Sequence, residues 1–395
     1  MINLEYPVEE VKINRIDIYE KIIAEIQSVY KETLKDTCWM VGYSGGKDST
    51  VLLHLVWKAV ERLKDQSTFV NVVCNDTLVE NPLITDYVNE SMENINKIAK
   101  ETGLPFKATI TNPKTSETFW VQMIGKGYPA PTHYSRWCTN HLKIRPSVNF
   151  LKEEKTIVLL GTRYAESKTR KKNMQKHDKR SDTLLKPHIS NKLHKVYSPI
   201  RDLKLGEVWF VLNQWKTPWL KDQGILYKIY ADASADDYEC PTIPTDNSHK
   251  TCGQSRFGCW TCTVVSRDRT LMSQITQGHT ELQPLLDFRN KLVKDKDKPN
   301  NRLPYGRRGF ISKRRDGTNC GSYSFEYRER LLNDLLALEV KTGRKLISKA
   351  EIKLIKEIWA DDIANPPKLR PSKNEARWQE ELDELPLSKA LGLKV

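Results

Sequence analysis

The chain has 395 residues, which is enough to bury a substantial core and favours two domains. Hydrophobic residues make up 38% and charged residues 29%, a composition that excludes wholesale disorder. The net charge of +14 favours nucleic acid as a partner, with a basic enzyme whose charge has no specific purpose as the alternative. No apolar stretch approaches the roughly 20 residues of a membrane helix, so we expect a cytoplasmic protein without a membrane partner.

Short apolar runs alternate with helical patterns over the first 230 residues. A helical pattern covers 16–31, and the apolar run 38–43 leads through two glycines into a second helical pattern over 51–63. The same order recurs further along the chain, with apolar runs at 69–73, 106–110 and 156–160 and a helical pattern at 83–99. This alternation predicts an α/β fold with a parallel sheet flanked by helices on both faces.

The composition changes near residue 230. Residues 168–195 are basic and lose periodicity, which predicts an exposed loop, and beyond 231 the chain becomes rich in Cys, Pro and Thr. A basic stretch over 301–315 and helical patterns within 326–363 follow. We therefore predict two domains, residues 1–230 and a smaller, mainly helical, cysteine-containing domain over 231–395.

The loop between the first predicted strand and its helix reads Ser44-Gly45-Gly46-Lys47-Asp48-Ser49. Its glycines let the backbone come close to an anion that lies on the N-terminus of the following helix. The spacing is not that of a Walker A loop, which argues against a kinase or GTPase. An ordinary glycine turn with an Asp-Ser cap is the alternative. We predict a phosphate site.

Other candidate residues follow the second and fourth predicted strands, where binding sites lie in such folds. Asp76 suits contact with a nucleotide or Mg2+, or a plain turn cap. Gly161 and Arg163 follow the fourth strand. Arg163 can bind an α-phosphate or a substrate phosphate bidentately, and a surface ion pair with Glu166 is the alternative.

Eight cysteines in a reducing compartment point to metal binding or sulfur chemistry rather than to disulfides. Four of them have eleven, six and two intervening residues and form the predicted metal set, namely Cys240, Cys252, Cys259 and Cys262. Four thiolates suit zinc or an iron–sulfur cluster, and the spacing does not choose between the two metals. A purely structural metal knot is the alternative.

Cys138 lies apart from that set, near four basic side chains: Arg136, His141, Lys143 and Arg145. Neighbouring positive charge lowers the pKa of a thiol and favours the thiolate. Three roles are open for Cys138: a persulfide carrier, a cluster ligand in place of Cys240, and an inert buried thiol.

Two basic tracts suggest contacts with DNA. The first consists of Lys168, Arg170, Lys171, Lys172, Lys176, Lys179 and Arg180. The second interleaves cations with Tyr305 and Phe310 and consists of Arg302, Arg307, Arg308, Lys313, Arg314 and Arg315. Charge tracts are usually just solvated, but cations with aromatic side chains grip phosphates and stack on an exposed base. We expect both tracts to contact DNA.

The phosphate loop resembles that of the PP-loop ATP pyrophosphatases, which have an adenine nucleotide alpha hydrolase-like fold and include PAPS (sulfate-assimilation) reductases, GMP synthetases and tRNA thiolases. The resemblance implies that ATP is split between its α and β phosphates. The residues implied to hold pyrophosphate, with Mg2+ sharing the charge, are Ser44, Gly45, Gly46, Asp48 and Ser49. Lys47 would neutralise charge that develops on the phosphates.

Over about residues 39–265 the sequence is most similar to DNA phosphorothioation sulfurtransferases of the DndC type, with the related SspD type as the near alternative. The matching segments are 42–50, 76–82, 127–131, 136–139, 161–163, 166–167 and 259–262. The resemblance implies a [4Fe-4S] cluster, with zinc as the alternative. It also implies DNA, a cysteine desulfurase and other phosphorothioation subunits as partners.

The implied reaction adenylates a DNA backbone phosphate so that sulfur replaces a non-bridging oxygen. We expect Lys47, Asp48, Cys138 and Arg163 to act in it. Three alternatives remain: a reductase of adenylated sulfate, a tRNA thiolase, and a non-catalytic nucleotide-sensing DNA-binding subunit.

Overall fold

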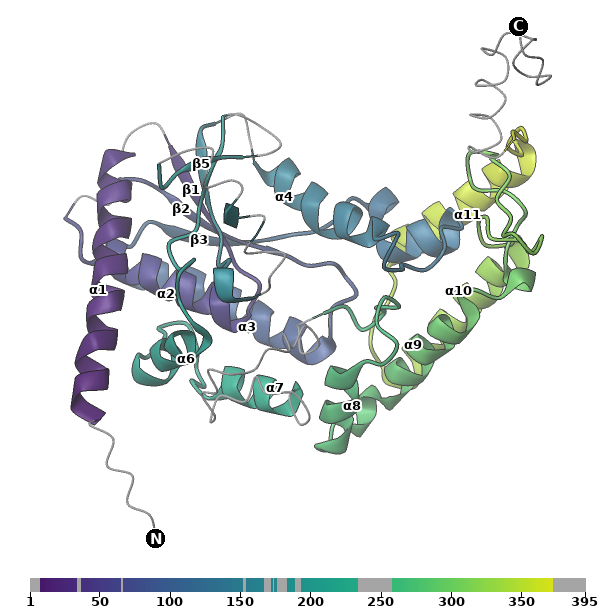
Figure 1. The fold of residues 1–395 in the computed structure, drawn as a ribbon. Coiled ribbons are helices and arrows are strands. Elements are labelled where there is room, and N and C mark those ends of the chain that lie inside the picture. The colour runs from purple at the N-terminus through teal and green to yellow at the C-terminus, as the bar shows by residue number, and fades with distance from the viewer. Residues whose placement is uncertain are drawn as a thin grey trace, which may run out of the picture.

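The computed structural model describes residues 8–33, 37–64, 67–151, 154–166, 172, 174–175, 183–188, 193–233 and 258–371. In the view of Figure 1, the sheet and the helices that pack on it lie at the left, and the helices of the C-terminal part lie at the right. Residues 118–150 run from one side to the other in that view. Among the described residues, no helix combines the length and the apolar character needed to cross a lipid bilayer.

The sheet has six strands in the order β3-β2-β1-β4-β6-β5. Their bounds are β1 Cys38–Gly42, β2 Val70–Asn75, β3 Phe106–Thr111, β4 Thr156–Leu159, β5 Lys186–Pro187 and β6 Lys195–Tyr197. All neighbouring strands pair in parallel except β5 and β6, which are antiparallel. The predicted parallel sheet is therefore confirmed, with one short antiparallel strand at its edge.

The longer helices of the sheet part are α1 Val8–Glu32, α2 Lys47–Glu61, α3 Pro82–Thr102, α4 Arg145–Phe150, α6 Leu205–Gln214 and α7 Ile225–Ala233. The C-terminal part contains α8 Arg269–Thr276, α9 Gln283–Asp295, α10 Phe325–Thr342 and α11 Lys349–Ala364. Two π-helices, η2 Val121–Gly125 and η3 Thr139–Ile144, lie in the connecting segment. The 3-10 turns are η1 Thr115–Glu117, η4 Tyr164–Glu166, η5 Thr280–Leu282 and η6 Pro299–Asn301.

The two faces of the sheet carry different side chains, because successive residues of a strand point to opposite faces. On β1, Trp39 and Val41 are buried in a core to which α1, α2, α3 and α6 contribute. Met40, between them, points to the other face and packs with Val73 and Val158. α4 packs against this second face, and a cavity borders the rest of it.

A second core joins distant parts of the chain. Phe119, Trp120 and Ile124 pack there with side chains of α9, α10 and α11. The indole of Trp120 donates to the carbonyl of Leu346 at 2.9 Å, and that of Trp359 donates to Ile124 at 2.9 Å. The boundary expected near residue 230 therefore does not separate the two cores, because residues 119–142 belong to the second one.

His54 in α2 is buried between Trp215 and Trp219, with ring centroids 5.6 and 6.5 Å away. Among the described residues neither ring nitrogen has a hydrogen-bond partner. Burial, and then the charge of Lys58, lower the pKa of His54 from 6.5 to about 4. The folded protein must therefore keep this imidazole neutral.

Acid should therefore destabilise the protein through His54. The unfolded chain takes up a proton near pH 6.5 and the folded chain only near pH 4, so stability is full above pH 6.5 and falls between these values. The loss should be about 3 kcal/mol. His54→Phe should remove most of it, as measured by thermal unfolding at pH 7.5 and 4.5. His279→Asn, at an exposed position, is the control, and equal acid sensitivity of wild type and His54→Phe would refute the assignment.

Candidate functional site

The phosphate loop lies between the end of β1 and the start of α2, where the sequence predicts it. Gly46 is the N-cap of α2 and offers no side chain to cap the first N–H groups of that helix. Ser49 Oγ donates to the carbonyl of Gly46 at 2.9 Å and accepts from the N–H of Ser44 at 3.2 Å. The loop is thus held from within, and the positive end of the α2 dipole faces the site.

Gly45 shows why the loop needs glycine. Its φ is +72°, in the left-handed region, and an added Cβ would lie 2.5 Å from Cγ2 of Val88 in α3. Any other residue would be strained there and would collide with α3. The close approach of the loop to α3 therefore depends on this position.

Asp48 holds two cations next to the loop. Arg163 Nε donates to Asp48 Oδ1 at 2.6 Å, and Lys47 Nζ lies 3.6 Å from Asp48 Oδ2. Lys47 Nζ also lies 4.6 Å from the ring centroid of Tyr230, whose hydroxyl accepts from the Lys47 N–H at 3.3 Å. The side chains of α7 and of the β4 end therefore fix both charged residues of the loop.

The structure corrects the role expected for Arg163. The residue is 3% exposed, and besides Asp48 its guanidinium donates to the carbonyl of Leu203 at 3.0 Å. A guanidinium held in this way orients Asp48 from behind the loop rather than reaching for a substrate phosphate. The alternative partner, Glu166, contacts Arg163 through its backbone N–H.

Gly161 lies against the start of α2. A Cβ at Gly161 would lie 3.0 Å from the carbonyl carbon and oxygen of Asp48 and 3.1 Å from the N–H nitrogen of Ser49. All three are backbone atoms that cannot swing aside. Gly161 thus permits the β4 end to touch the phosphate loop, and its role in binding a nucleotide stays a prediction.

Asp76 forms the predicted turn cap and also lies at the cavity, the place predicted for a nucleotide or Mg2+. One carboxylate oxygen accepts the N–H of Leu78 at 2.8 Å, which is the turn cap, and Leu78 has a φ of +63°. Burial raises the pKa of Asp76, opposed by that hydrogen bond. Asp76 also lines the cavity next to the loop, so its role toward a nucleotide or Mg2+ stays a prediction.

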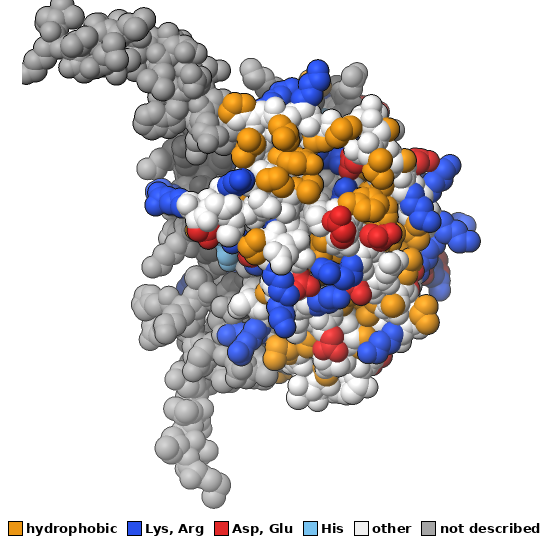
Figure 2. Space-filling model, turned by 90° about the vertical axis from the view of Figure 1, so that its right-hand side faces the viewer, with side chains coloured by type: hydrophobic (Ala, Val, Ile, Leu, Met, Phe, Trp, Pro, Cys, Tyr) orange, Lys and Arg blue, Asp and Glu red, His pale blue; other side chains and the backbone are white. Residues whose placement is uncertain are grey.

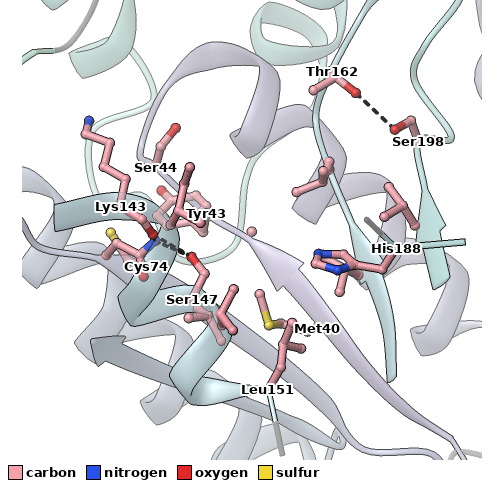
Figure 3. Close-up of a pocket in the computed structure, with 18 of the residues that line it drawn as sticks. Met40, Tyr43, Ser44, Cys74, Lys143, Ser147, Leu151, Thr162, His188 and Ser198 are labelled. Carbon is pink, nitrogen blue, oxygen red and sulfur yellow. Dashed lines mark hydrogen bonds between the residues drawn. The ribbon is translucent and has the colours of Figure 1, made fainter. Parts of the chain in front are cut away.

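A cavity of about 1010 Å³ begins at Ser44 and extends over the second face of the sheet. Its floor is apolar and includes Met40, Val158 and Leu151, and Figure 3 shows Ser44 and Lys143 on the same side of the view. Glu80 lines the same cavity. Typical ligand pockets enclose about 300–1,000 Å³, so this space is large enough for a nucleotide and a second group.

The Lys143 end of the cavity adjoins Cys259. Glu80 accepts from Lys143 Nζ at 3.2 Å and from Thr77 at 3.1 Å, and Cys259 Sγ lies 3.8 Å from the same oxygen, Oε1. Burial works against the charge of Lys143, but the carboxylate of Glu80 outweighs it and raises the lysine pKa. Burial, and then Glu80, raise the pKa of the Cys259 thiol. A charged pair therefore separates the cavity from a cysteine.

Arg289 of α9 holds the turn that carries Cys259 and Cys262. Its fully buried guanidinium donates to the carbonyl of Cys262 at 2.9 Å, to Ser266 at 2.8 Å, and to Val265. Hydrogen bonds from a charged donor are stronger than neutral ones. The three hydrogen bonds of Arg289 together fix the position of the turn that contains both cysteines.

The structure corrects the pKa expected for Cys138. Burial, and then the charge of Cys262, raise this pKa instead of lowering it. Two of the cations expected to act on it are paired elsewhere, since Lys143 contacts Glu80 and Arg145 contacts Glu117. Cys138 and Cys259 both pack against the second core.

The predicted metal set cannot be assembled from the structure. Cys240 and Cys252 lie outside the described residues, and within the described part no three His, Cys, Asp or Glu side chains are arranged to hold a metal ion. Thiolates as donors suit a soft metal, but Cys138, Cys259 and Cys262 are not arranged as a ligand set in the described part of the chain. The cluster and its zinc alternative stay predictions, and no reaction step is derived through either.

Glu80, Tyr230 and Arg289 were not predicted as site residues. The sequence could have pointed to Glu80, since this residue lies in the segment 76–82 that carries the family resemblance. No such signal existed for Tyr230 and Arg289, because each reaches the site only through the packing of a helix distant in sequence.

The second basic tract is partly structural. Arg302 is 9% exposed and donates to the carbonyls of Gly321 and Lys296, and Arg307 pairs with Asp362 at 2.7 Å. On the face shown in Figure 2, Lys and Arg side chains lie among acidic and apolar ones rather than in one continuous patch. Of the first tract, only Lys172 lies in the described part of the chain.

Comparisons with known proteins agree with the fold. A family model described as the phosphoadenosine phosphosulfate reductase domain matches residues 38–265, more than half of the chain. An uncharacterised protein of Methanocaldococcus jannaschii is 30% identical over 210 residues, which cover 52% of this chain and 37% of that protein. The chain therefore spans little more than a third of that relative.

Two solved structures are similar at low identity. The U34-tRNA thiolase NcsA from Methanococcus maripaludis, with its [4Fe-4S] cluster, has a TM-score of 0.32 and 15% identity, covering 70% of this chain and 79% of that one. The NH3-dependent NAD synthetase from Campylobacter jejuni has a TM-score of 0.33 and 14% identity, covering 72% and 96%. Likenesses at these TM-scores carry no argument about activity.

Gly161→Ala should weaken ATP binding without removing any functional group, because the added methyl pushes on the backbone of Asp48 and Ser49. We expect the affinity for a non-hydrolysable ATP analogue to fall about 10- to 100-fold. Gly206→Ala in α6 is the matched control, since nothing lies within 4 Å of its Cβ position. Equal affinities in the two variants would contradict this account of the loop.

Proposed function

The chain belongs to the phosphoadenosine phosphosulfate reductase domain family, and from this premise we propose that it is an ATP pyrophosphatase that transfers sulfur to an oxygen activated by adenylation. Members of this family are enzymes of the ATP pyrophosphatase type. The finer proposal is that the acceptor is a backbone phosphate of DNA, so that the product is a phosphorothioate.

One observation carries the proposal. A single cavity is lined by Ser44 of the phosphate loop at one place and by Glu80 and Lys143 at another, and Glu80 contacts Cys259. We therefore propose that the adenylated group forms at the loop end of this cavity and that the sulfur arrives from the Cys259 side, where the Glu80–Lys143 pair lies between the cavity and the thiol. A simple nucleotide-binding site has no need of cysteines beside it.

The residues of the loop support the first step. The N-terminus of α2 and Lys47 stabilise negative charge on the β and γ phosphates, and Mg2+ would share that charge. An acceptor oxygen attacks the α-phosphorus, the bond to pyrophosphate breaks, and the oxygen gains AMP. Asp48, held by Arg163, keeps Lys47 in place while this charge moves.

Sulfur then replaces the activated oxygen. Hydrogen sulfide forms a bond to phosphorus, releases a proton, and expels AMP with the former phosphate oxygen. If a cysteine persulfide attacks instead, its outer sulfur forms the bond to phosphorus and AMP leaves with the former phosphate oxygen. A second thiol then attacks the inner sulfur, which releases the phosphorothioate and leaves a disulfide between the two cysteines. An external thiol reductant must reduce that disulfide before the next turnover. We propose Cys138 as the second thiol, because it packs against the same core as Cys259.

The net charge of +14 supports a polyanionic acceptor, and the resemblance in the segments 42–50 and 76–82 supports DNA in particular. A cysteine desulfurase is the proposed sulfur donor, and other phosphorothioation subunits are the proposed partners. A reductase of adenylated sulfate would act on a small anion instead.

The test supplies ATP, Mg2+, DNA, cysteine and a cysteine desulfurase under anaerobic conditions. We expect pyrophosphate release that depends on DNA, and phosphorothioate dinucleotides after nuclease digestion, detected by mass spectrometry. Cys138→Ser and Cys259→Ser should each lower the phosphorothioate yield about 100-fold or more while pyrophosphate release continues.

Cys320→Ser is the matched control, because Cys320 contacts Ser312 in the C-terminal part. It should retain both activities. Pyrophosphate release with free sulfate in place of DNA would favour the reductase, and undiminished phosphorothioate in Cys259→Ser would remove Cys259 from the reaction.

A further inference from the structure

The segment that leads to the cavity is the least acidic part of the chain. Residues 118–152 contain no Asp or Glu, although the whole chain has 50 in 395 residues. The same 35 residues hold five cations, Lys126, Arg136, Lys143, Arg145 and Lys152. In the structure Lys143 pairs with Glu80 and Arg145 with Glu117, so among the described residues of the run Lys126 and Arg136 are left to attract phosphates.

An ordered turn within this segment presents an aromatic ring to solvent. The N–H of Thr132 donates to the carbonyl of Ser135 at 3.0 Å, and the N–H of Ser135 donates to Thr132 Oγ1 at 3.2 Å. Tyr134 lies at the tip of this turn and is fully exposed, at 102%. No other apolar side chain that the structure describes as exposed exceeds 87%.

Arg136 follows Tyr134 by two residues in the chain. It is exposed, and one of its amino groups is 3.4 Å from Nδ1 of His133. Within the described residues no carboxylate pairs with it, whereas Lys143 contacts Glu80 and Arg145 contacts Glu117. Its charge is therefore available to an external anion.

The same segment continues directly into the cavity. Two residues after Arg136 comes Cys138, and then η3, from which Lys143 and Ile144 line the cavity. Tyr134 and Arg136 therefore lie just before a helix whose last residues line the cavity.

Resting on the proposed function, we propose that the turn 132–136 holds the acceptor strand of DNA, with Tyr134 stacking on an unpaired base and Arg136 binding a phosphate next to it. An aromatic ring reaches a base face only where the base is unpaired or turned out of the duplex. The preferred acceptor is therefore single-stranded or locally opened DNA. The second basic tract, with Arg302 and Arg307 in structural contacts, is the weaker candidate.

The test compares Tyr134→Ala with Tyr134→Phe, which keeps the stacking ring. Fluorescence anisotropy with a labelled single-stranded DNA should show that Tyr134→Ala binds about 5- to 150-fold more weakly, while Tyr134→Phe binds like the wild type. Arg136→Gln should lower the slope of log affinity against log salt by about 1. With a fully paired duplex of the same sequence, Tyr134→Ala should have little effect.

Wild-type affinity in Tyr134→Ala would overturn the proposal, as would an equal loss in Tyr134→Phe or tighter binding to RNA of the same sequence. Failure of this inference is distinguishable from failure of the proposed function. If the wild type forms phosphorothioate and Tyr134→Ala does so with unchanged KM for DNA, the function stands and the surface is wrong. Thermal unfolding of both variants checks that the exposed position leaves the fold intact.

Discussion

The buried ion pair between Asp48 and Arg163 joins the start of α2 to the end of β4. The two residues are 115 positions apart, and their 2.6 Å contact lies where the sheet, the loop and α7 meet. An unpaired charge in such a place would be costly, so each partner requires the other. Lys47 takes its position from the same carboxylate, and Gly161 allows the approach. The loop is therefore held in shape before any anion arrives.

A comparable constraint acts on the cysteines. Arg289 keeps a buried positive charge among carbonyls of the Cys262 turn, and Glu80 and Lys143 form a pair beside Cys259. The charges near the thiols come from α9, from η3 and from the β2–α3 connection. Sulfur chemistry in this chain thus depends on the second core as much as on the sheet.

The sequence correctly predicted those features of the fold that depend on residues close together in the chain. The alternation of apolar runs identified β1 to β4 and the loop, but not the short strands β5 and β6, since period and glycine chemistry act over a few residues. It did not identify Tyr230, Arg289 or the Asp48 contact of Arg163, because each depends on packing between distant elements. The pKa of Cys138 was predicted in the wrong direction for the same reason. Two cations near it in sequence pair with Glu80 and Glu117 in space, and the burial that raises its pKa was only one of three alternatives that the sequence left open.

The shared second core has a consequence for biosynthesis. Trp120 and Ile124 hydrogen-bond to residues 226 and 235 positions later, and their neighbours pack against the last helices. A ribosome adding 5–20 residues per second needs roughly 10–50 s to make that length. During this interval the sheet can form while the 119–124 segment has no partner and exposes aromatic surface. The nascent chain therefore passes through a partly folded, aggregation-prone state. Its yield in a cell depends on how well chaperones shield the exposed aromatic surface until translation ends.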